Sequence, residues 1–221
     1  LNNHIEKKEF WLNLVDLQIG DSSKAAIYFA EHFPEEKSIL FLAMLHLSRM
    51  HHPLARKVIT ELANSDVSET QKSLIEIARK VLENDEFYAL SLINSLLEKK
   101  ITLEDMSYKI ELFASYLCMD MLRLQDSHQY LVKYEKHTRN DPACRVAIAR
   151  LAKVNNNKTK LIDQLDKAFG ENIELIPKDL YFDYLSGIKD NKNKINHLLS
   201  KLSEKDSAEI SLTEIKISAL F

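Results

Sequence analysis

Residues 68–100, SETQKSLIEIARKVLENDEFYALSLINSLLEKK, contain two helix patterns separated by a short polar break. Ser68 and Gln71 have the spacing of a capping box, in which each side chain bonds the backbone N–H of the other residue. Apolar residues then recur at steps of three and four, which is the period of one helix face. The dipeptide Asn84-Asp85 interrupts this pattern, and a second apolar series follows it. The stretch therefore predicts two helices joined by a tight turn.

The same pattern of helix, break and helix extends in both directions. Pairs of predicted helices begin near residues 5, 36, 69, 103, 142 and 178, at intervals of about 31 to 39 residues. One such hairpin cannot bury its apolar face alone, whereas a stack of hairpins buries a continuous core. The sequence therefore predicts an all-α fold, an α-solenoid of stacked antiparallel hairpins with about 12–13 helices in all.

The predicted helices differ in how clearly their ends are marked. Asp141 and Pro142 combine a capping residue with a first-turn proline, so we expect a helix from 142 to 154. The longest predicted helix, 102–124, contains no internal break, and we expect the next helix to start at Asp126-Ser127. After residue 177, three weaker patterns predict helices at 178–188, 192–202 and 207–220.

The regular helix pattern stops near Gly170, and this suggests where the repeat domain ends. Gly170 ends a predicted helix, and residues 171–177 form the longest irregular segment of the chain. We therefore expect a repeat domain at 1–170. Residues 171–221 are expected to form C-terminal helices that cap the same solenoid, because terminal repeats need a polar outer face.

Composition excludes several classes of protein. Only 3 glycines occur among 221 residues, and neither a dinucleotide-binding nor a P-loop glycine pattern is present. The 30 basic residues are balanced by 33 acidic ones, which gives a net charge of −3 and no general attraction to nucleic acid or an anionic membrane. No apolar run approaches the roughly 18 residues that cross a bilayer. We expect this segment neither to bind nucleic acid nor to span a membrane.

The two cysteines indicate the compartment. Cys118 and Cys144 each lie in a predicted helix among apolar neighbours, which favours buried thiols in a reducing, cytoplasmic setting. A disulfide between neighbouring repeats is the alternative. Because the chain begins with Leu1 rather than Met, we expect it to be an excerpt, with room before it for a signal, an anchor or another domain. The lysine, asparagine and isoleucine content leans toward a bacterial source.

Small residues recur at one place in each predicted helix of a pair. They are Ala43 and Ala55, Ala78 and Ala89, Ala114 and Ser127, each followed or preceded by large apolar residues. In this respect residues 5–170 resemble the tetratricopeptide repeat family, whose unit is a helix, a turn and a helix that cross closely at small residues. HEAT-like pairs and a non-repetitive helical bundle are the alternatives.

The resemblance implies a binding surface. In tetratricopeptide proteins the first helix of each pair lines a concave groove that holds a peptide or a helix of a protein partner. Helical geometry would place nine residues there: Leu40, Met44, Leu47, Lys72, Arg79, Tyr108, Glu111, Arg150 and Lys153. The apolar members would anchor apolar side chains and the basic members would hold carboxylates, so the expected partner carries apolar and acidic groups. With a one-residue change of register, Leu40 and Leu47 would instead be buried between repeats.

Catalytic patterns are absent from the sequence. His46, His51 and His52 are spaced so that one helix face cannot present all three, and neither HExxH nor a serine-nucleophile motif occurs. We therefore expect no enzyme activity, no metal and no cofactor.

Three functional hypotheses remain from the sequence. The first is a non-catalytic binding module, acting as a scaffold or adaptor for a protein or peptide. The second is the regulatory or sensor domain of a larger protein, such as a transcription regulator whose N-terminal part is absent. The third is a helical-repeat enzyme acting on nucleic acid, against which the net negative charge and the single tryptophan, Trp11, both argue.

Overall fold

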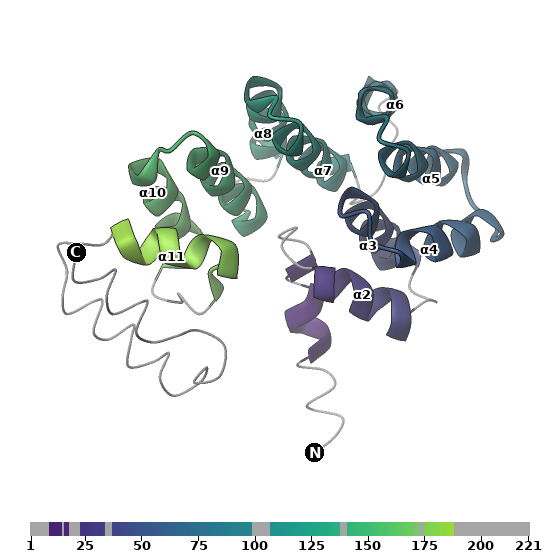
Figure 1. Ribbon diagram of the computed structural model, residues 1–221, viewed down its shortest axis with the longest axis horizontal. Helices are drawn as coiled ribbons and strands as arrows, with labels where there is room; N and C mark the ends of the chain where they lie inside the picture. Colours follow the sequence, from purple (N-terminus) through teal and green to yellow (C-terminus); the bar gives the residue numbers. More distant parts are fainter. Residues whose placement is uncertain are drawn as a thin grey trace, which may run out of the picture. The chain divides into compact units, whose positions relative to one another are not determined.

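The computed structural model describes residues 9–14, 16–17, 23–33, 37–98, 107–137, 141–170, 172 and 175–187, and every regular element within them is helical (Figure 1). Residues 9–14 and 16–17 are helical. The labelled helices are α2 (Ser23–His32), α3 (Lys37–Arg49), α4 (Leu54–Ala63), α5 (Glu69–Leu82), α6 (Glu86–Glu98), α7 (Ser107–Asp120), α8 (Leu124–His137), α9 (Pro142–Val154), α10 (Lys158–Phe169) and α11 (Lys178–Gly187). The all-α prediction is confirmed for these residues. The helices expected at 192–202 and 207–220 lie outside them.

The chain divides into two compact units, residues 1–138 (unit 1) and 139–221 (unit 2). Unit 1 contains α2 to α8, and unit 2 contains α9 to α11. The division lies one hairpin earlier than the boundary expected at residue 170, since α11 packs on α10 and α9. The hairpin of α9 and α10 and the helix α11 that follows it therefore belong to the same unit.

Of the predicted helix pairs, those that begin near residues 36, 69, 103 and 142 form hairpins in the described residues. In residues 68–98, Ser68 Oγ accepts from the Gln71 N–H, and the Gln71 side chain accepts from the Ser68 N–H at 2.9 Å, so the capping box is present. The helix pairs α3–α4, α5–α6, α7–α8 and α9–α10 each pack together across a short turn.

The four turns within these hairpins share one backbone conformation. Each has a residue with positive φ just after its first helix: His51 (50°), Asn84 (58°), Leu122 (57°) and Asn156 (53°). At the third turn the Arg123 N–H bonds the Cys118 carbonyl at 2.8 Å and the Leu122 N–H bonds the Met119 carbonyl at 2.9 Å. This is a Schellman motif, which satisfies the last carbonyls of a helix and reverses the chain. The same pair of bonds recurs at the other three turns.

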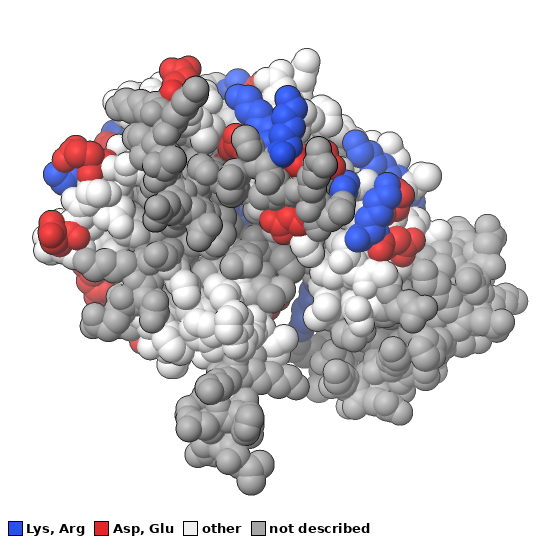
Figure 2. Space-filling model, turned by 180° about the vertical axis from the view of Figure 1, so that it is seen from behind, with Lys and Arg blue, Asp and Glu red and all other residues white. Residues whose placement is uncertain are grey.

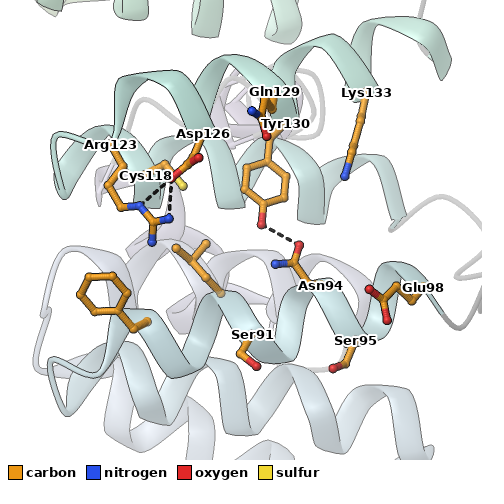
Figure 3. Close-up of a pocket in the computed structure, with 12 residues that line it drawn as sticks. Ser91, Asn94, Ser95, Glu98, Cys118, Arg123, Asp126, Gln129, Tyr130 and Lys133 are labelled. Carbon is orange, nitrogen blue, oxygen red and sulfur yellow. Dashed lines mark hydrogen bonds and ion pairs between the residues drawn. The ribbon is translucent and has the colours of Figure 1, made fainter.

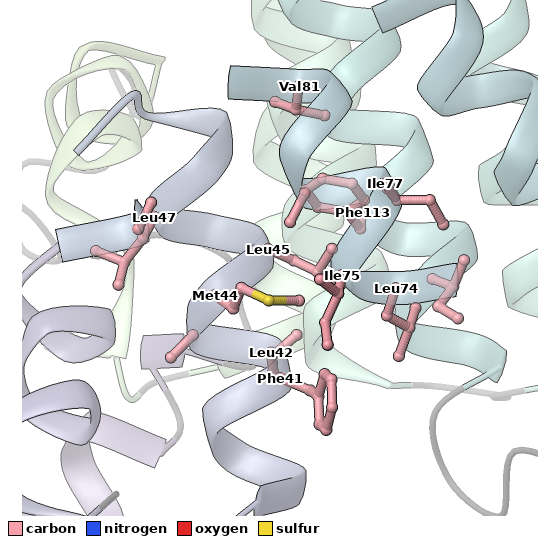
Figure 4. Close-up of a cluster of buried hydrophobic side chains, with 14 of the residues drawn as sticks. Phe41, Leu42, Met44, Leu45, Leu47, Leu74, Ile75, Ile77, Val81 and Phe113 are labelled. Atoms are coloured by element: carbon pink, nitrogen blue, oxygen red, sulfur yellow. The ribbon is translucent and has the colours of Figure 1, made fainter. Parts of the chain in front are cut away.

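The core of unit 1 is built around α3 and α7. Every residue from Leu40 to Ser48 in α3 is buried, and so is every residue from Ile110 to Met119 in α7. Helix α3 packs against α2, α4, α5 and α7, and Figure 4 shows side chains of α3, α5 and α7 gathered in one apolar cluster. A helix surrounded in this way is buried on all sides rather than along one stripe.

Three side-chain contacts join α3 directly to α7. Arg49 Nη1 of α3 lies 3.0 Å from Asp120 Oδ2 of α7, and the Arg49 guanidinium lies 5.1 Å from the centre of the Tyr116 ring. The ring of His46 meets that of Phe113 edge-on, with centres 6.4 Å apart. The first helices of the second and fourth predicted pairs are therefore in contact.

Within the described residues, none of the helices combines the length and the apolar character that crossing a membrane requires.

Candidate functional site

Four of the predicted groove residues are not on an accessible surface. Leu40, Met44 and Leu47 are 2%, 0% and 0% exposed, and Glu111 is also buried. Placing them in an open groove was wrong because α3 packs against α2, α4, α5 and α7, and α7 packs against α3, α6 and α8, so neither helix presents an open face here. Leu40, Met44 and Leu47 belong to the hydrophobic core of unit 1.

Lys72 and Arg79 do lie together, on an exposed side of α5. With Asp66 and Glu76 they line a hollow of about 520 Å³ beside the turn between α4 and α5. Lys72 Nζ is 2.6 Å from Glu69 Oε1, and this contact raises the pKa of Lys72. Arg79 Nη1 is 3.7 Å from Glu76 Oε2. Both cations thus have carboxylate partners on their own helix.

Arg150 and Lys153 act inside unit 2. Arg150 Nε lies 3.1 Å from Asp179 Oδ2, and Lys153 Nζ lies 2.8 Å from Asp183 Oδ2. These ion pairs fasten α9 to α11, so the carboxylate-binding chemistry expected of the two residues is used within the chain. The side chain of Tyr108 lies outside the described residues.

A groove of about 530 Å³ runs between α6 and α8, the second helices of two successive hairpins (Figure 3). Side chains from both helices line its walls, and Cys118 of α7 lies at its floor. The lining residues are Phe87, Leu90, Ser91, Asn94, Ser95, Glu98, Cys118, Arg123, Asp126, Gln129, Tyr130 and Lys133.

The periodicity of α6 explains why one wall is polar. Its apolar residues Ala89, Leu90, Ile93 and Leu96 are buried. Between them a second series, spaced by three and four residues, turns to the groove and is exposed: Ser91, Asn94, Ser95 and Glu98. Helix α8 has the same division, with exposed Gln129 and Lys133 on its groove side. Each wall is therefore one face of an amphipathic helix.

One hydrogen bond crosses the groove and fixes its centre. The Tyr130 hydroxyl of α8 donates to Asn94 Oδ1 of α6 at 2.7 Å. Burial raises the pKa of Tyr130, so the hydroxyl keeps its proton and remains a donor. Because Oδ1 is used as the acceptor, the Asn94 amide nitrogen is turned away from Tyr130 and its N–H groups are left to face the groove (Figure 3).

Several other polar side chains on the walls have no hydrogen-bond partner among the described residues. The side chains of Ser91, Ser95 and Gln129 make no hydrogen bond to another residue in the part of the chain that the structure describes. Lys133 Nζ lies 5.6 Å from the centre of the Tyr130 ring. The groove therefore presents hydroxyl and amide groups that are free to bond a ligand.

The end of the groove near the hairpin turns has a different character. The Arg123 guanidinium lies 5.3 Å from the centre of the Phe87 ring, and its Nη2 is 2.5 Å from Asp126 Oδ2. Phe87 is nevertheless 68% exposed. An aromatic ring held by a fixed cation thus borders the groove at this end.

Cys118 does not supply a nucleophile. It is fully buried, and this burial raises the pKa of its thiol to about 11. The thiol is therefore protonated at neutral pH, whereas the thiolate is the reactive form. Cys144 is likewise a buried free thiol.

In the view of Figure 2, lysine and arginine side chains lie beside aspartate and glutamate side chains instead of gathering into a field of one sign. Among the residues that the structure describes, no group of three or more histidine, cysteine, aspartate or glutamate side chains could hold a metal ion.

The sequence could have indicated one wall of the groove but not the groove itself. Ser91, Asn94, Ser95 and Glu98 recur at the helix period, a pattern that is typical of any solvated helix face. Only the packing of α6 near α8 turns this face into a wall, and that packing joins residues about 35 positions apart, such as Asn94 and Tyr130.

Comparison with known proteins gave no match: no family model, no curated protein and no solved structure matches the chain. The resemblance to tetratricopeptide repeats therefore stays a prediction from the sequence.

Proposed function

We propose that this chain is a non-catalytic binding module, a stack of tetratricopeptide-like hairpins that holds an extended peptide segment of a protein partner between α6 and α8. The partner, a protein or a peptide, is of the class expected from the sequence. The site is moved from the first helices of the pairs to the second helices.

The proposal rests on the hydrogen-bonding side-chain groups that line the groove and have no hydrogen-bond partner among the described residues. From Phe87 to Glu98 the α6 wall is about 16 Å long at 1.5 Å per residue, which matches about five residues of extended peptide. An extended peptide presents N–H and C=O groups in alternation. The amide N–H groups of Asn94, the hydroxyl groups of Ser91 and Ser95, and the amide of Gln129 supply donors and acceptors for them.

Two further observations support a stack of repeated hairpins. Four turns have the same Schellman backbone. In addition, the small residues that carried the resemblance, among them Ala43, Ala78, Ala89 and Ala114, are all 0% exposed. Small side chains at these places allow close approach of paired helices.

Selection from a library of random 12-residue peptides displayed on phage tests the function. Selected peptides are synthesised with a fluorophore, and their Kd is measured by fluorescence anisotropy on the wild-type chain and on Gln129→Arg, which places a long side chain in the groove. We expect Kd to rise at least about tenfold, a loss of about 1.4 kcal/mol.

Gln125→Arg is the matched control, because Gln125 is exposed on the same helix and does not line the groove. It should leave Kd unchanged within about twofold. Failure to select any peptide would overturn the proposed function. Peptides whose Kd is the same for both variants would show that binding occurs elsewhere.

A further inference from the structure

The charged side chains that line the α6–α8 groove differ in whether they are paired. Arg123 and Asp126 form an ion pair with each other, with Arg123 Nη2 2.5 Å from Asp126 Oδ2. Glu98 and Lys133 are both exposed, and neither makes a hydrogen bond or an ion pair with another residue that the structure describes. Within the described residues, one carboxylate and one ammonium of the groove are therefore left for a ligand.

Two contacts between the walls show how α6 and α8 run. The Arg123 guanidinium, directly before α8, lies 5.3 Å from the centre of the Phe87 ring of α6. The Tyr130 hydroxyl of α8 donates to Asn94 Oδ1 of α6. From the first contact to the second, both walls advance by seven residues, from 87 to 94 and from 123 to 130. The two helices therefore run in the same direction along the groove.

Glu98 and Lys133 consequently lie at one end of the groove, on opposite walls (Figure 3). Glu98 is four residues after Asn94 on α6, and Lys133 is three residues after Tyr130 on α8, so each lies about one turn further along its helix. The Lys133 ammonium is 5.6 Å from the centre of the Tyr130 ring, which keeps it over the groove. We call Glu98 and Lys133 the charged end.

We propose that the charged end binds an acidic and a basic side chain that lie within two positions of each other in the bound peptide segment. The acidic side chain pairs with Lys133 and the basic side chain pairs with Glu98. This inference rests on the proposed function, since the charged end belongs to the same groove, and it names two residues of the segment.

The geometry of an extended peptide supports this spacing. When its backbone groups bond the two walls, its side chains point alternately to the floor and out of the groove. Outward side chains two positions apart are separated by about 7 Å, so one can lean toward Lys133 of α8 and the next toward Glu98 of α6. A segment with charges of one sign would satisfy one wall and be repelled by the other.

Selection from the library of random 12-residue peptides, repeated on charge variants, tests the inference. On the wild-type chain we expect acidic and basic residues within two positions of each other to be enriched at least about twofold over the unselected library. Lys133→Glu makes both walls acidic at this end and should select pairs of basic residues. Glu98→Lys should select pairs of acidic residues. The double variant Glu98→Gln/Lys133→Gln should lose the charge preference and still select peptides.

Affinity measurements give a second readout. For a fluorophore-labelled peptide selected on the wild type, Lys133→Glu should raise Kd about fivefold in about 0.05 M NaCl, and by less in about 1 M NaCl, because salt screens exposed charges. Lys57→Glu is the matched control: it changes the net charge equally, but Lys57 is an exposed residue of α4 that does not line the groove. It should change Kd by less than about twofold.

Each other outcome also decides the matter. If selected peptides bind in a manner sensitive to Gln129→Arg but carry no enriched pair of opposite charges, the proposed function stands and the charged end alone is refuted. The inference is also overturned if the double glutamine variant selects the same charge pairs, or if Lys57→Glu raises Kd as much as Lys133→Glu. Failure to select any peptide would overturn both proposals.

Discussion

Helices α7 and α8 form one hairpin, yet they are buried in different ways. In α7 every residue from Ile110 to Met119 is buried. In α8 burial is confined to one face, Ser127, Tyr130, Leu131 and Tyr134, and the opposite residues are exposed. Helix α7 packs on α8, α6 and α3, whereas α8 packs chiefly on α7.

This difference determines which helices can meet a partner. A first helix that is surrounded by other helices has no free face, so its side chains contribute to stability. A second helix keeps a polar face, and two such faces form the α6–α8 groove. In the α7–α8 hairpin the core helix and the helix of the proposed binding surface are therefore different members of the pair.

The largest expected effect comes from placing a charge in α3, which is surrounded by other helices. Met44 of α3 is 0% exposed, so Met44→Glu buries a carboxylate without a partner and should lower the free energy of unfolding by at least about 3 kcal/mol. Arg79→Glu, on an exposed side of α5, should change it by less than about 1 kcal/mol. Urea unfolding followed by circular dichroism measures both. A Met44→Glu chain of normal stability would mean that α3 has an open face after all.

Loss of the link between α3 and α7 should have an intermediate effect. Asp120→Asn removes the negative charge that pairs with Arg49. The Arg49 side chain is only 15% exposed, and its Nε has no hydrogen-bond partner among the described residues. We expect the free energy of unfolding to fall by about 1–2 kcal/mol. The control is Asp163→Asn, which removes a surface pair with Lys167 and should cost about 0.5 kcal/mol or less. Equal losses would show that the inner contact is no stronger than a surface pair.

Alkaline pH should lower the free energy of unfolding through Cys118 of α7, which lies at the floor of the groove. The folded pKa of Cys118 is raised from 9.0 to about 11 by burial. Between these values the unfolded thiol loses its proton while the folded thiol keeps it, so the free energy of unfolding falls as pH rises from 9 to 11. Cys118→Ala should show a smaller decline over that range in urea unfolding. A decline of the same size in both proteins would contradict the assigned cause.

The smallest expected change is a gain in stability. Ser127 of α8 is fully buried, and its hydroxyl has no hydrogen-bond partner in the described part of the chain. Ser127→Ala should therefore raise the free energy of unfolding by about 0.5–1 kcal/mol. Ser115 of α7 is equally buried, but its hydroxyl donates to the Leu112 carbonyl at 2.7 Å. Ser115→Ala should give no gain, and a loss on both substitutions would rule out an unsatisfied hydroxyl at Ser127.

Helix ends were predictable where a residue carries a local signal. The Asp141 side chain accepts from the Ala143 N–H at 2.9 Å, as a capping residue should. Gly170 has a φ of +57° and ends α10. The helix expected at 102–124 instead ends at Asp120, because Leu122 adopts the positive φ that no sequence rule expects of leucine.

The site was less predictable because it depends on contacts between distant segments. In a regular repeat each unit meets only its neighbours, and from that rule the first helices were expected to line a groove. The contact of α3 with α7 joins the second and the fourth helix pair, which are not consecutive in the chain. The sequence around Met44 or Glu111 contains no local pattern that predicts this contact. Residues such as Asn94 and Gln129 show only a polar face until the partner helix is placed beside them.

The central claim is that a partner binds between α6 and α8, the second helices of two hairpins. Hydrogen exchange tests this claim most directly. Amide exchange is measured by mass spectrometry with and without a saturating 12-residue peptide from the library selection. We predict slower exchange in Ser91–Glu98 of α6 and Asp126–Lys133 of α8, and no change in α3 and α7, whose amides are already protected in the core. Slower exchange along α3 and α5 with α6 and α8 unchanged would contradict the account and return the binding site to the first helices.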